Sequence, residues 1–171
     1  MCMKTADLCD VFSEQLSICE QPFQIYGKKK NFFGKIRTVR CLNDNVLVKE
    51  ALETIEAGEV LVVDGGGSKK VALMGDNLAA IAVKRKLAGV IVFGCIRDSK
   101  EINQMDIGVF ALGTCPLKSM KLGEGDRDQI LTFGGIKWKP GQFVYCDEDG
   151  ILVSESVLNL EKKSTKFISN I

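Results

Sequence analysis

The sequence predicts a single α/β domain with a mixed sheet and a second half rich in antiparallel strands. In the first half, short apolar runs such as residues 59–64 alternate with segments of helical periodicity such as residues 46–57, the order expected of strand–helix–strand units. In the second half, residues 130–155 form short alternating runs separated by glycine- and proline-containing turns, a pattern typical of hairpins. A length of 171 residues suits one buried core rather than two domains.

The N-terminal third predicts one helix and one strand. Residues 5–17 have the periodicity of a short amphipathic helix, with Thr5 in the position of an N-cap. Its apolar face consists of Leu8, Val11, Phe12 and Leu16. An irregular segment, residues 22–31, carries three consecutive lysines that either attract an anion or form a solvated turn. Residues 32–41 then predict a strand with one wet face.

The composition narrows the class of protein. With 23 basic and 22 acidic residues the formal net charge is +1, so electrostatics favour neither a nucleic-acid nor a membrane-surface partner. No apolar run approaches the roughly 18–20 residues of a membrane-spanning helix, and the N-terminus lacks the apolar region of a secretory signal. The seven cysteines form no CxxC pair, which favours reduced, mostly buried thiols and a cytoplasmic location.

The stretch from Val71 to Glu101 predicts a strand, a Gly-Asp turn, a helix, a second strand and then Arg97-Asp98. A strand–helix–strand unit brings the ends of its two strands to the same edge of a sheet. Asp76, which follows the first strand, would then lie near Arg97, Asp98 and Glu101, which follow the second strand. Because the chain contains no histidine, three carboxylates and one guanidinium in this place indicate a hard cation and an anionic, oxygen-rich substrate.

The start of the predicted helix is suited to an anion. Asp76 stands at or near its N-cap, and the unpaired N–H groups of the first turn, together with the helix dipole, favour a carboxylate or phosphate. Gly75 lets such a ligand approach the backbone closely. The Arg97 guanidinium offers a fork of donors that matches a carboxylate or an enolate oxygen.

The carboxylates predict a magnesium or manganese site. These ions prefer one or two carboxylates and several waters, so Asp98 would bind the metal directly while Asp76 and Glu101 hold waters. The same residues have simpler interpretations, because an Asp at a helix N-cap needs no ligand and an Arg-Asp pair is often a salt bridge. The glycine run of residues 65–67 is likewise either a tight turn or a cradle for substrate.

The chain resembles the regulator of ribonuclease E activity A (RraA) group and its relatives, the 4-hydroxy-4-methyl-2-oxoglutarate/4-carboxy-4-hydroxy-2-oxoadipate aldolases. The resemblance runs from about Thr5 to Ser154. Its motifs, in chain order, are TADLCD, IRTVRC, VLVVDGGGS, GDNLA, LGEGD, FGGIKWKPG and YCDEDGILVS. It implies one domain of the swivelling β/β/α type over residues 1–161. Residues 162–171 would form a C-terminal tail.

The aldolase branch is marked by an Asp that is followed, after twenty intervening residues, by Arg-Asp and, after two more, by Asp or Glu. This chain satisfies the pattern with Asp76, Arg97-Asp98 and Glu101. The resemblance implies a divalent metal held by Asp98. The implied substrate contacts are Gly75, Asp76, Asn77, Leu78 and Arg97. Arg97 and Asp76 would be the catalytic residues, with Asp76 orienting a water for the proton transfers.

The implied activity is a class II-type, metal-dependent aldolase that releases pyruvate from 4-hydroxy-4-methyl-2-oxoglutarate, with oxaloacetate decarboxylation as a second activity. Both reactions pass through a pyruvate enolate, which Arg97 and the metal would stabilise. The VVDGGGS and LGEGD stretches and the short length are closer to the regulatory members, so the alternative is a non-catalytic protein that binds and inhibits ribonuclease E. The resemblance also implies a homotrimer with sites near the subunit interfaces, each completed by a neighbouring subunit.

Overall fold

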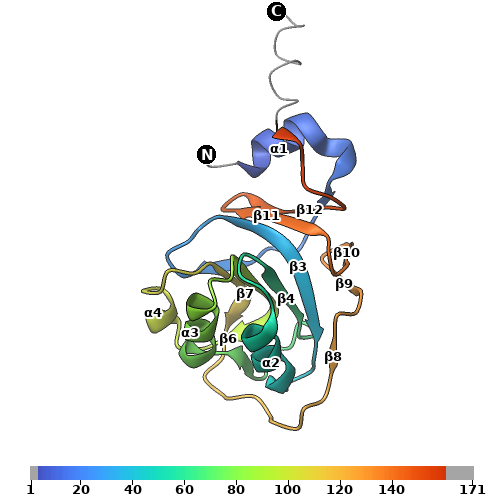
Figure 1. The fold of residues 1–171 in the computed structure, drawn as a ribbon. Coiled ribbons are helices and arrows are strands. Elements are labelled where there is room, and N and C mark those ends of the chain that lie inside the picture. The colour runs from blue at the N-terminus through green and yellow to red at the C-terminus, as the bar shows by residue number, and fades with distance from the viewer. Residues whose placement is uncertain (1–3, 161–171) are drawn as a thin grey trace, which may run out of the picture.

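The computed structural model describes residues 4–160, which fold around one curled, mixed sheet (Figure 1). The strands of this sheet are β1 (Ser17–Ile18), β2 (Gln24–Tyr26), β3 (Phe32–Arg40), β4 (Val60–Asp64), β5 (Ala72–Met74), β6 (Gly89–Ile96), β7 (Val109–Thr114), β8 (Asp126–Arg127), β11 (Phe143–Asp147) and β12 (Gly150–Ser154). They lie in the order β1-β12-β11-β3-β4-β6-β7-β2, with β5 beside β6 and β8 beside β3. A separate hairpin pairs β9 (Leu131–Phe133) with β10 (Ile136–Trp138). The helices are α1 (Thr5–Phe12), the 3₁₀ turn η1 (Ser13–Gln15), α2 (Val46–Thr54), α3 (Asp76–Lys84) and α4 (Ser99–Ile102).

The centre of the sheet is parallel and its flanks are antiparallel. Strands β3, β4, β6 and β7 pair in parallel. β3 is long enough to belong to both parts, because residues 32–35 pair antiparallel with β11 and residues 36–40 pair parallel with β4. The predicted mixed sheet with an antiparallel second half is therefore confirmed.

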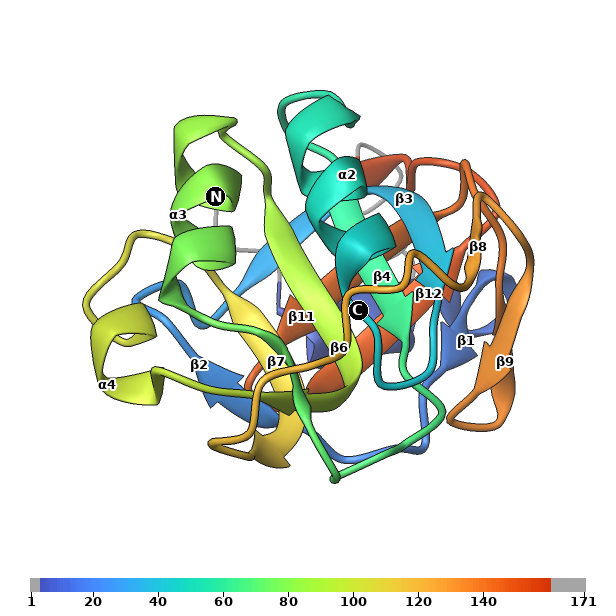
Figure 2. The ribbon, with the colours of Figure 1, turned by 90° about the horizontal axis from the view of Figure 1, so that it is seen from below.

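Strand β4 shows why a continuous apolar run is needed at the centre of the sheet. Val60 and Val62 pack on one face in a cluster with Trp138, whereas Leu61 and Val63 pack on the other face in the cluster that holds α2 and α3. Figure 2 shows α2 and α3 side by side over the central strands. Since both faces of β4 are covered, successive side chains must all be apolar.

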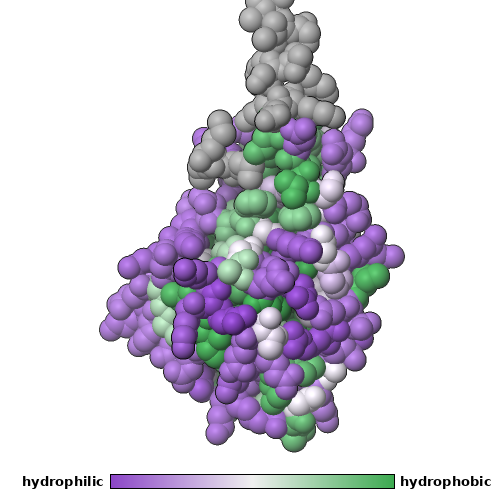
Figure 3. Space-filling view, viewed as in Figure 1, coloured by the Kyte–Doolittle hydropathy of each residue, from purple (hydrophilic) through white to green (hydrophobic). Residues whose placement is uncertain are grey.

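Helix α1 covers the outer side of the β11–β12 hairpin. Leu8 and Phe12 are buried in a small cluster with Tyr145 and Leu152. Apolar side chains gather over α1 at the top of Figure 3, whereas most of the face below them is hydrophilic. This helix is a third layer, remote from α2 and α3.

The N-terminal helix is shorter than predicted. It ends at Phe12 and is followed by η1, because the chain must turn to pair β1 with β12. Thr5 is the first helical residue rather than the N-cap, which is Lys4. The N–H and hydroxyl of Thr5 instead donate to Asp147, at 2.7 and 2.6 Å.

The segment predicted to be irregular, residues 22–31, contains strand β2, which pairs with β7. Strand β8 lies within residues 122–128 and pairs with β3. The three lysines of residues 28–30 are exposed, as the solvated-turn interpretation expects. The tail predicted for residues 162–171 lies outside the described residues.

The glycine run after β4 is a tight turn. The N–H groups of Gly65 and Gly67 both donate to the carbonyl of Phe93, at 3.0 and 3.1 Å, and Gly66 and Gly67 have positive φ. The six cysteines in the described part of the chain are all free, and four of them are buried. Within residues 4–160 no helix is both long and apolar enough to span a bilayer.

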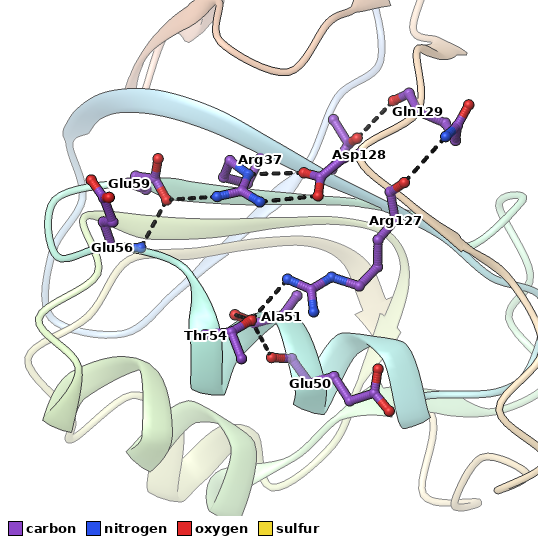
Figure 4. A network of polar contacts seen from close by, with 10 residues as sticks. Arg37, Glu50, Ala51, Thr54, Glu56, Glu59, Arg127, Asp128 and Gln129 are labelled. Atoms are coloured by element: carbon purple, nitrogen blue, oxygen red, sulfur yellow. Dashed lines mark hydrogen bonds and ion pairs between the residues drawn. The ribbon is translucent and has the colours of Figure 1, made fainter.

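Polar contacts fasten the segment around β8 to β3 and α2 (Figure 4). Arg37 donates to both carboxylate oxygens of Asp128, at 2.8 and 3.0 Å, and forms an ion pair of 3.5 Å with Glu59. Arg127 donates to the hydroxyl of Thr54 at 2.8 Å. The long connection between β7 and β9 is thereby held against α2.

Candidate functional site

Strand β5, helix α3 and strand β6 form the predicted strand–helix–strand unit. β5 pairs parallel with β6, and the N–H of Arg97 donates to the carbonyl of Met74 at 2.9 Å. The two turns meet, because the N–H of Asp76 donates to Oδ2 of Asp98 at 3.1 Å. The expected proximity of these two turns is therefore observed.

Asp98 has a left-handed backbone, with φ +55° and ψ +39°, and is the N-cap of α4. This conformation is uncommon outside glycine, and strained backbone of this kind is enriched at functional sites. The carboxylate packs tightly on Gly75, where an added Cβ would lie 2.5 Å from Oδ2 of Asp98. With a φ of −125°, residue 75 has a backbone conformation that any amino acid can adopt. A glycine is therefore needed here for the close approach of Asp98 and not for its backbone conformation.

Arg97 is held loosely. Its Nε lies 3.8 Å from Oδ2 of Asp98, and its Nη1 lies 3.5 Å from the carbonyl of Pro116. The side chains of Arg97 and Asp98 are 42% and 36% exposed, so this ion pair contributes little to stability. Donors of the guanidinium therefore stay available to a ligand.

A cavity of about 620 Å³ opens beside these turns, between α2, the start of α3 and the segment after β7. Six residues predicted for the site line it: Gly75, Asp76, Asn77, Leu78, Arg97 and Asp98. Small-ligand sites typically have volumes of roughly 300–1,000 Å³. The structure thus brings most of the predicted site to one cavity of suitable size.

The first turn of α3 is less open than predicted. The N–H of Asp76 donates to Asp98, and the N–H of Asn77 donates to Oδ1 of Asp76 at 2.8 Å. Two of the donors expected to face an anion are thus occupied by carboxylates. A ligand at the start of α3 would have to displace these carboxylates or share the N–H groups with them.

Glu101 does not line the cavity; its side chain is exposed on α4. Across residues 4–160, no three Cys, Asp or Glu side chains are grouped closely enough to hold a metal together. Asp98 offers a free oxygen, because no hydrogen bond from the described residues reaches its Oδ1, and Oδ2 of Asp76 is likewise without such a bond. A single carboxylate beside an open cavity fits magnesium or manganese, which keep several of their waters.

Another part of the cavity lining was not predicted. It comes from the start of α2, including Asn45, and from Lys118, Ser119 and Lys121 in the segment after β7. A general rule about α/β sheets could have identified Lys118, Ser119 and Lys121 from the sequence. Ligands of α/β sheets bind beyond the carboxyl ends of parallel strands, and this segment follows β7 as Arg97 follows β6.

The comparisons with known proteins agree with this architecture. The family model described as "RraA-like: Aldolase/RraA" matches residues 5–153. The chain belongs to the RraA-like family. A relative from Bacillus cereus, provisionally named a 4-hydroxy-4-methyl-2-oxoglutarate aldolase, is 58% identical over 91% of this RraA-like chain and 98% of its own.

Two solved structures share the RraA-like fold at high identity. One is described as the S-adenosylmethionine: 2-dimethylmenaquinone methyltransferase from Geobacillus kaustophilus HTA426, with a TM-score of 0.91 and 61% identity over 91% of this chain and 97% of that one. The other, the RNA-processing inhibitor RraA from Thermus thermophilis, has a TM-score of 0.89 and 41% identity over 93% and 96%. The predicted family and fold are both confirmed.

Proposed function

We propose that this chain is a divalent-metal-dependent aldolase that cleaves 4-hydroxy-4-methyl-2-oxoglutarate to two molecules of pyruvate. The observation that supports it best is the convergence of Arg97, the free Oδ1 of Asp98 and the Gly75–Leu78 turn on one cavity. The provisional name of the Bacillus cereus relative agrees with this activity. Oxaloacetate decarboxylation would be a second activity of the same site.

The chemistry divides among a few groups. Arg97 would bind the carboxylate of the 2-oxo end and stabilise the enolate charge that develops there. Asp98 would hold the metal, and magnesium or manganese bound there supplies an electron-withdrawing charge beside the 2-oxo group. Asp76 would orient the water through which the 4-hydroxyl loses its proton and the departing enolate carbon gains one.

The test is pyruvate release from 4-hydroxy-4-methyl-2-oxoglutarate with magnesium or manganese, with and without a chelator. Replacing Asp98 by Ala, or Arg97 by Ala, is expected to lower kcat/KM by about 10²–10³-fold, the scale of removing one electrostatic group from a transition state. Lys137→Ala, on the exposed side of β10, is the control and should keep full activity. Undiminished turnover in Asp98→Ala, or native protein without metal-dependent turnover, would end this proposal.

A methyltransferase role has less support from the cavity. Among the described residues, no aromatic side chain lines it to stack on an adenine ring. Its lining of carboxylates, lysines and an arginine suits a small oxo acid better.

A second candidate function is the binding and inhibition of ribonuclease E, favoured by the 41% identity to the RNA-processing inhibitor RraA. It would use a protein-binding surface rather than the cavity, so Asp98→Ala should leave it intact. Retention of ribonuclease E on the immobilised protein, together with slower RNA cleavage, would support this role. Loss of that retention at modest salt would count against it.

We also propose that the chain assembles as a homotrimer with the cavity at the subunit interface. Large apolar side chains are exposed on the two segments that border the cavity: Leu42, Leu117, Met120 and Leu122, at 54–64%. Apolar groups exposed together around a cavity are typical of a contact surface. A neighbouring subunit packed there would exclude water and complete the site.

A further inference from the structure

A second, smaller groove of about 280 Å³ opens on the other face of the central sheet. Its buried apolar lining residues, Cys19, Phe110 and Ile151, belong to the cluster of Trp138, whereas α2 and α3 pack on the opposite cluster. The groove shares no lining residue with the cavity beside Arg97. The proposed aldolase therefore makes no use of it.

The groove lies between the two ends of the curled sheet. Ile25 on β2 and Phe110 on β7 line it from one end of the strand order, and Ile151 on β12 lines it from the other. Residues 19–23, which connect β1 to β2, complete the lining. Within the described residues β2 pairs with β7 alone, so it is an edge strand. Such an edge is where an extended segment of another protein can add by backbone pairing.

The apolar part of the groove is held in place by its neighbours. Phe110 and Ile151 are buried, and Phe23 packs edge-to-face on Phe133 with ring centroids 6.5 Å apart. The segment before Phe23 is fastened by the N–H of Glu20, which donates to the carbonyl of Gly134 at 2.8 Å. A preformed apolar floor of this kind suits the methylene stem of a long basic side chain, which is buried while its charged end stays at the rim.

The rim of the groove is acidic. The lining includes Glu20, Asp147, Glu148 and Asp149 but no lysine or arginine, although basic and acidic residues are nearly equal in number in the whole chain. Within residues 4–160, Glu20, Glu148 and Asp149 form no ion pair. Concentrated negative charge repels the phosphates of nucleic acids and anionic membranes and attracts a basic partner.

The carboxylates of the rim differ in what they can bind. Both oxygens of Asp147 are occupied, because Oδ1 accepts from the hydroxyl of Thr5 and the N–H of Asp149, and Oδ2 accepts from the N–H of Thr5. Glu148 and Asp149 are exposed in the turn between β11 and β12. The Glu20 carboxylate lies close over Gly135 in the β9–β10 turn, which has no Cβ to displace it. Three carboxylates are therefore available to a cation.

We propose that this groove docks an extended, arginine-containing segment of a partner protein. The methylene stem of an arginine would lie over Phe23 and Ile25, and its guanidinium would bind among the carboxylates of Glu20, Glu148 and Asp149. Arginine suits the groove better than lysine, because its planar guanidinium donates two parallel hydrogen bonds to a carboxylate and stacks on aromatic rings. Pairing along the free edge of β2 would keep the segment extended.

Fluorescence anisotropy with a labelled hexapeptide in which arginine alternates with valine tests this docking site. Native protein should bind it at least about tenfold more tightly than a peptide with glutamine in place of arginine, since hydrogen bonds to charged groups change affinity on that scale. Glu148→Gln combined with Asp149→Asn should weaken binding of the arginine peptide at least about tenfold. Glu20→Gln should weaken it as well, because this residue lies in a different segment of the lining.

The matched control removes the same charge elsewhere. Asp106→Asn combined with Glu124→Gln changes two exposed carboxylates outside the groove and should leave the affinity unchanged. Equal weakening by the two double variants would reveal general charge attraction and overturn the docking site. Native protein that binds N-acetylarginine amide as tightly as the peptide, or that binds no peptide, would overturn it too.

Failure of the docking site is distinguishable from failure of the aldolase. The Glu148→Gln, Asp149→Asn protein should lose peptide binding and keep native pyruvate release, because neither residue lines the cavity beside Arg97. Native turnover without peptide binding would contradict the docking site alone. Arginine-dependent peptide binding in a protein without turnover would support the docking site and contradict the aldolase.

Discussion

Gly75 and Asp98 show how one pair of residues shapes the site. The strained backbone of Asp98 turns the chain sharply after β6, and its carboxylate fills the space where a side chain on residue 75 would stand. The geometry of the proposed metal ligand therefore depends on a neighbour that bears no functional group. The Gly-Asp turn at residues 75–76 and the Arg-Asp turn at residues 97–98 are two parts of one arrangement.

At this scale we predict that Gly75→Ala impairs catalysis more than folding. The new methyl group would lie 2.5 Å from Asp98 Oδ2 and 3.3 Å from Arg97 Cγ, so both side chains must shift. A displacement of about 1 Å in a catalytic group costs roughly 10²-fold in rate. Measuring kcat/KM and the Tm of Gly75→Ala checks this prediction, because kcat/KM should fall strongly while the Tm changes little.

The matched control for this prediction is Gly150→Ala, at a position where an added Cβ meets nothing within 4 Å. It should keep native turnover. Native kcat/KM in Gly75→Ala would mean that the close approach at Asp98 has no role in catalysis.

At the scale of elements, the contact of α1 with β11 rests on Thr5 and Asp147 as well as on apolar packing. Burial would raise the pKa of Asp147, but the Thr5 hydroxyl and N–H, with the N–H groups of Asp149 and Gly150, outweigh it and lower the pKa. A carboxyl with a lowered pKa in the folded state stabilises the protein above its unfolded pKa of about 3.9. That stability is lost as the pH falls through the folded-state pKa.

We therefore predict a pH-dependent cost for Thr5→Ala. At neutral pH the variant should lose about 1 kcal/mol of unfolding free energy, a modest value because Asp147 is partly exposed. The difference from native protein should shrink below about pH 4, as Asp147 becomes protonated. Urea unfolding at pH 7 and pH 3 measures it.

Thr132→Ala, at an exposed position on β9, is the control for this cost and should show no such dependence on pH. A cost for Thr5→Ala that stays constant with pH would mean that the carboxylate does not contribute.

At the scale of the whole molecule, the cavity joins elements that lie far apart in the chain. Its walls come from α2, from the β5–α3 turn, from the turn after β6 and from the segment after β7. Large apolar side chains on neighbouring segments, Leu42, Leu117, Met120 and Leu122, are 54–64% exposed. The candidate site thus lies next to exposed apolar side chains of this chain.

For the assembly we predict a particle of about three times the 18.7 kDa of one chain in light scattering. Leu117→Asp combined with Leu122→Asp should dissociate it, because charges would be buried at the interface, and turnover should fall with assembly. Ile18→Asp, an exposed apolar position on β1, should leave both unchanged. A native monomer with full turnover would contradict the trimer.

Local pattern alone determined the parallel centre of the sheet, the hairpins of the second half and the meeting of the two turns at residues 75–76 and 97–98. Periodicity and turn residues act over a few positions, and a parallel strand–helix–strand unit leaves little freedom in where its ends lie. The twenty-residue spacing between Asp76 and Arg97 was informative through the resemblance to the aldolase branch, whose pattern has the same spacing.

The tertiary structure alone decided which side chains face the cavity. It brought Ser119 and Lys121 to the cavity that Arg97 also lines and left Glu101 on the outside of α4. It also directed the Thr5 hydroxyl to Asp147 instead of its own helix. Each outcome depends on strand register and on the packing of distant elements, which no local pattern encodes.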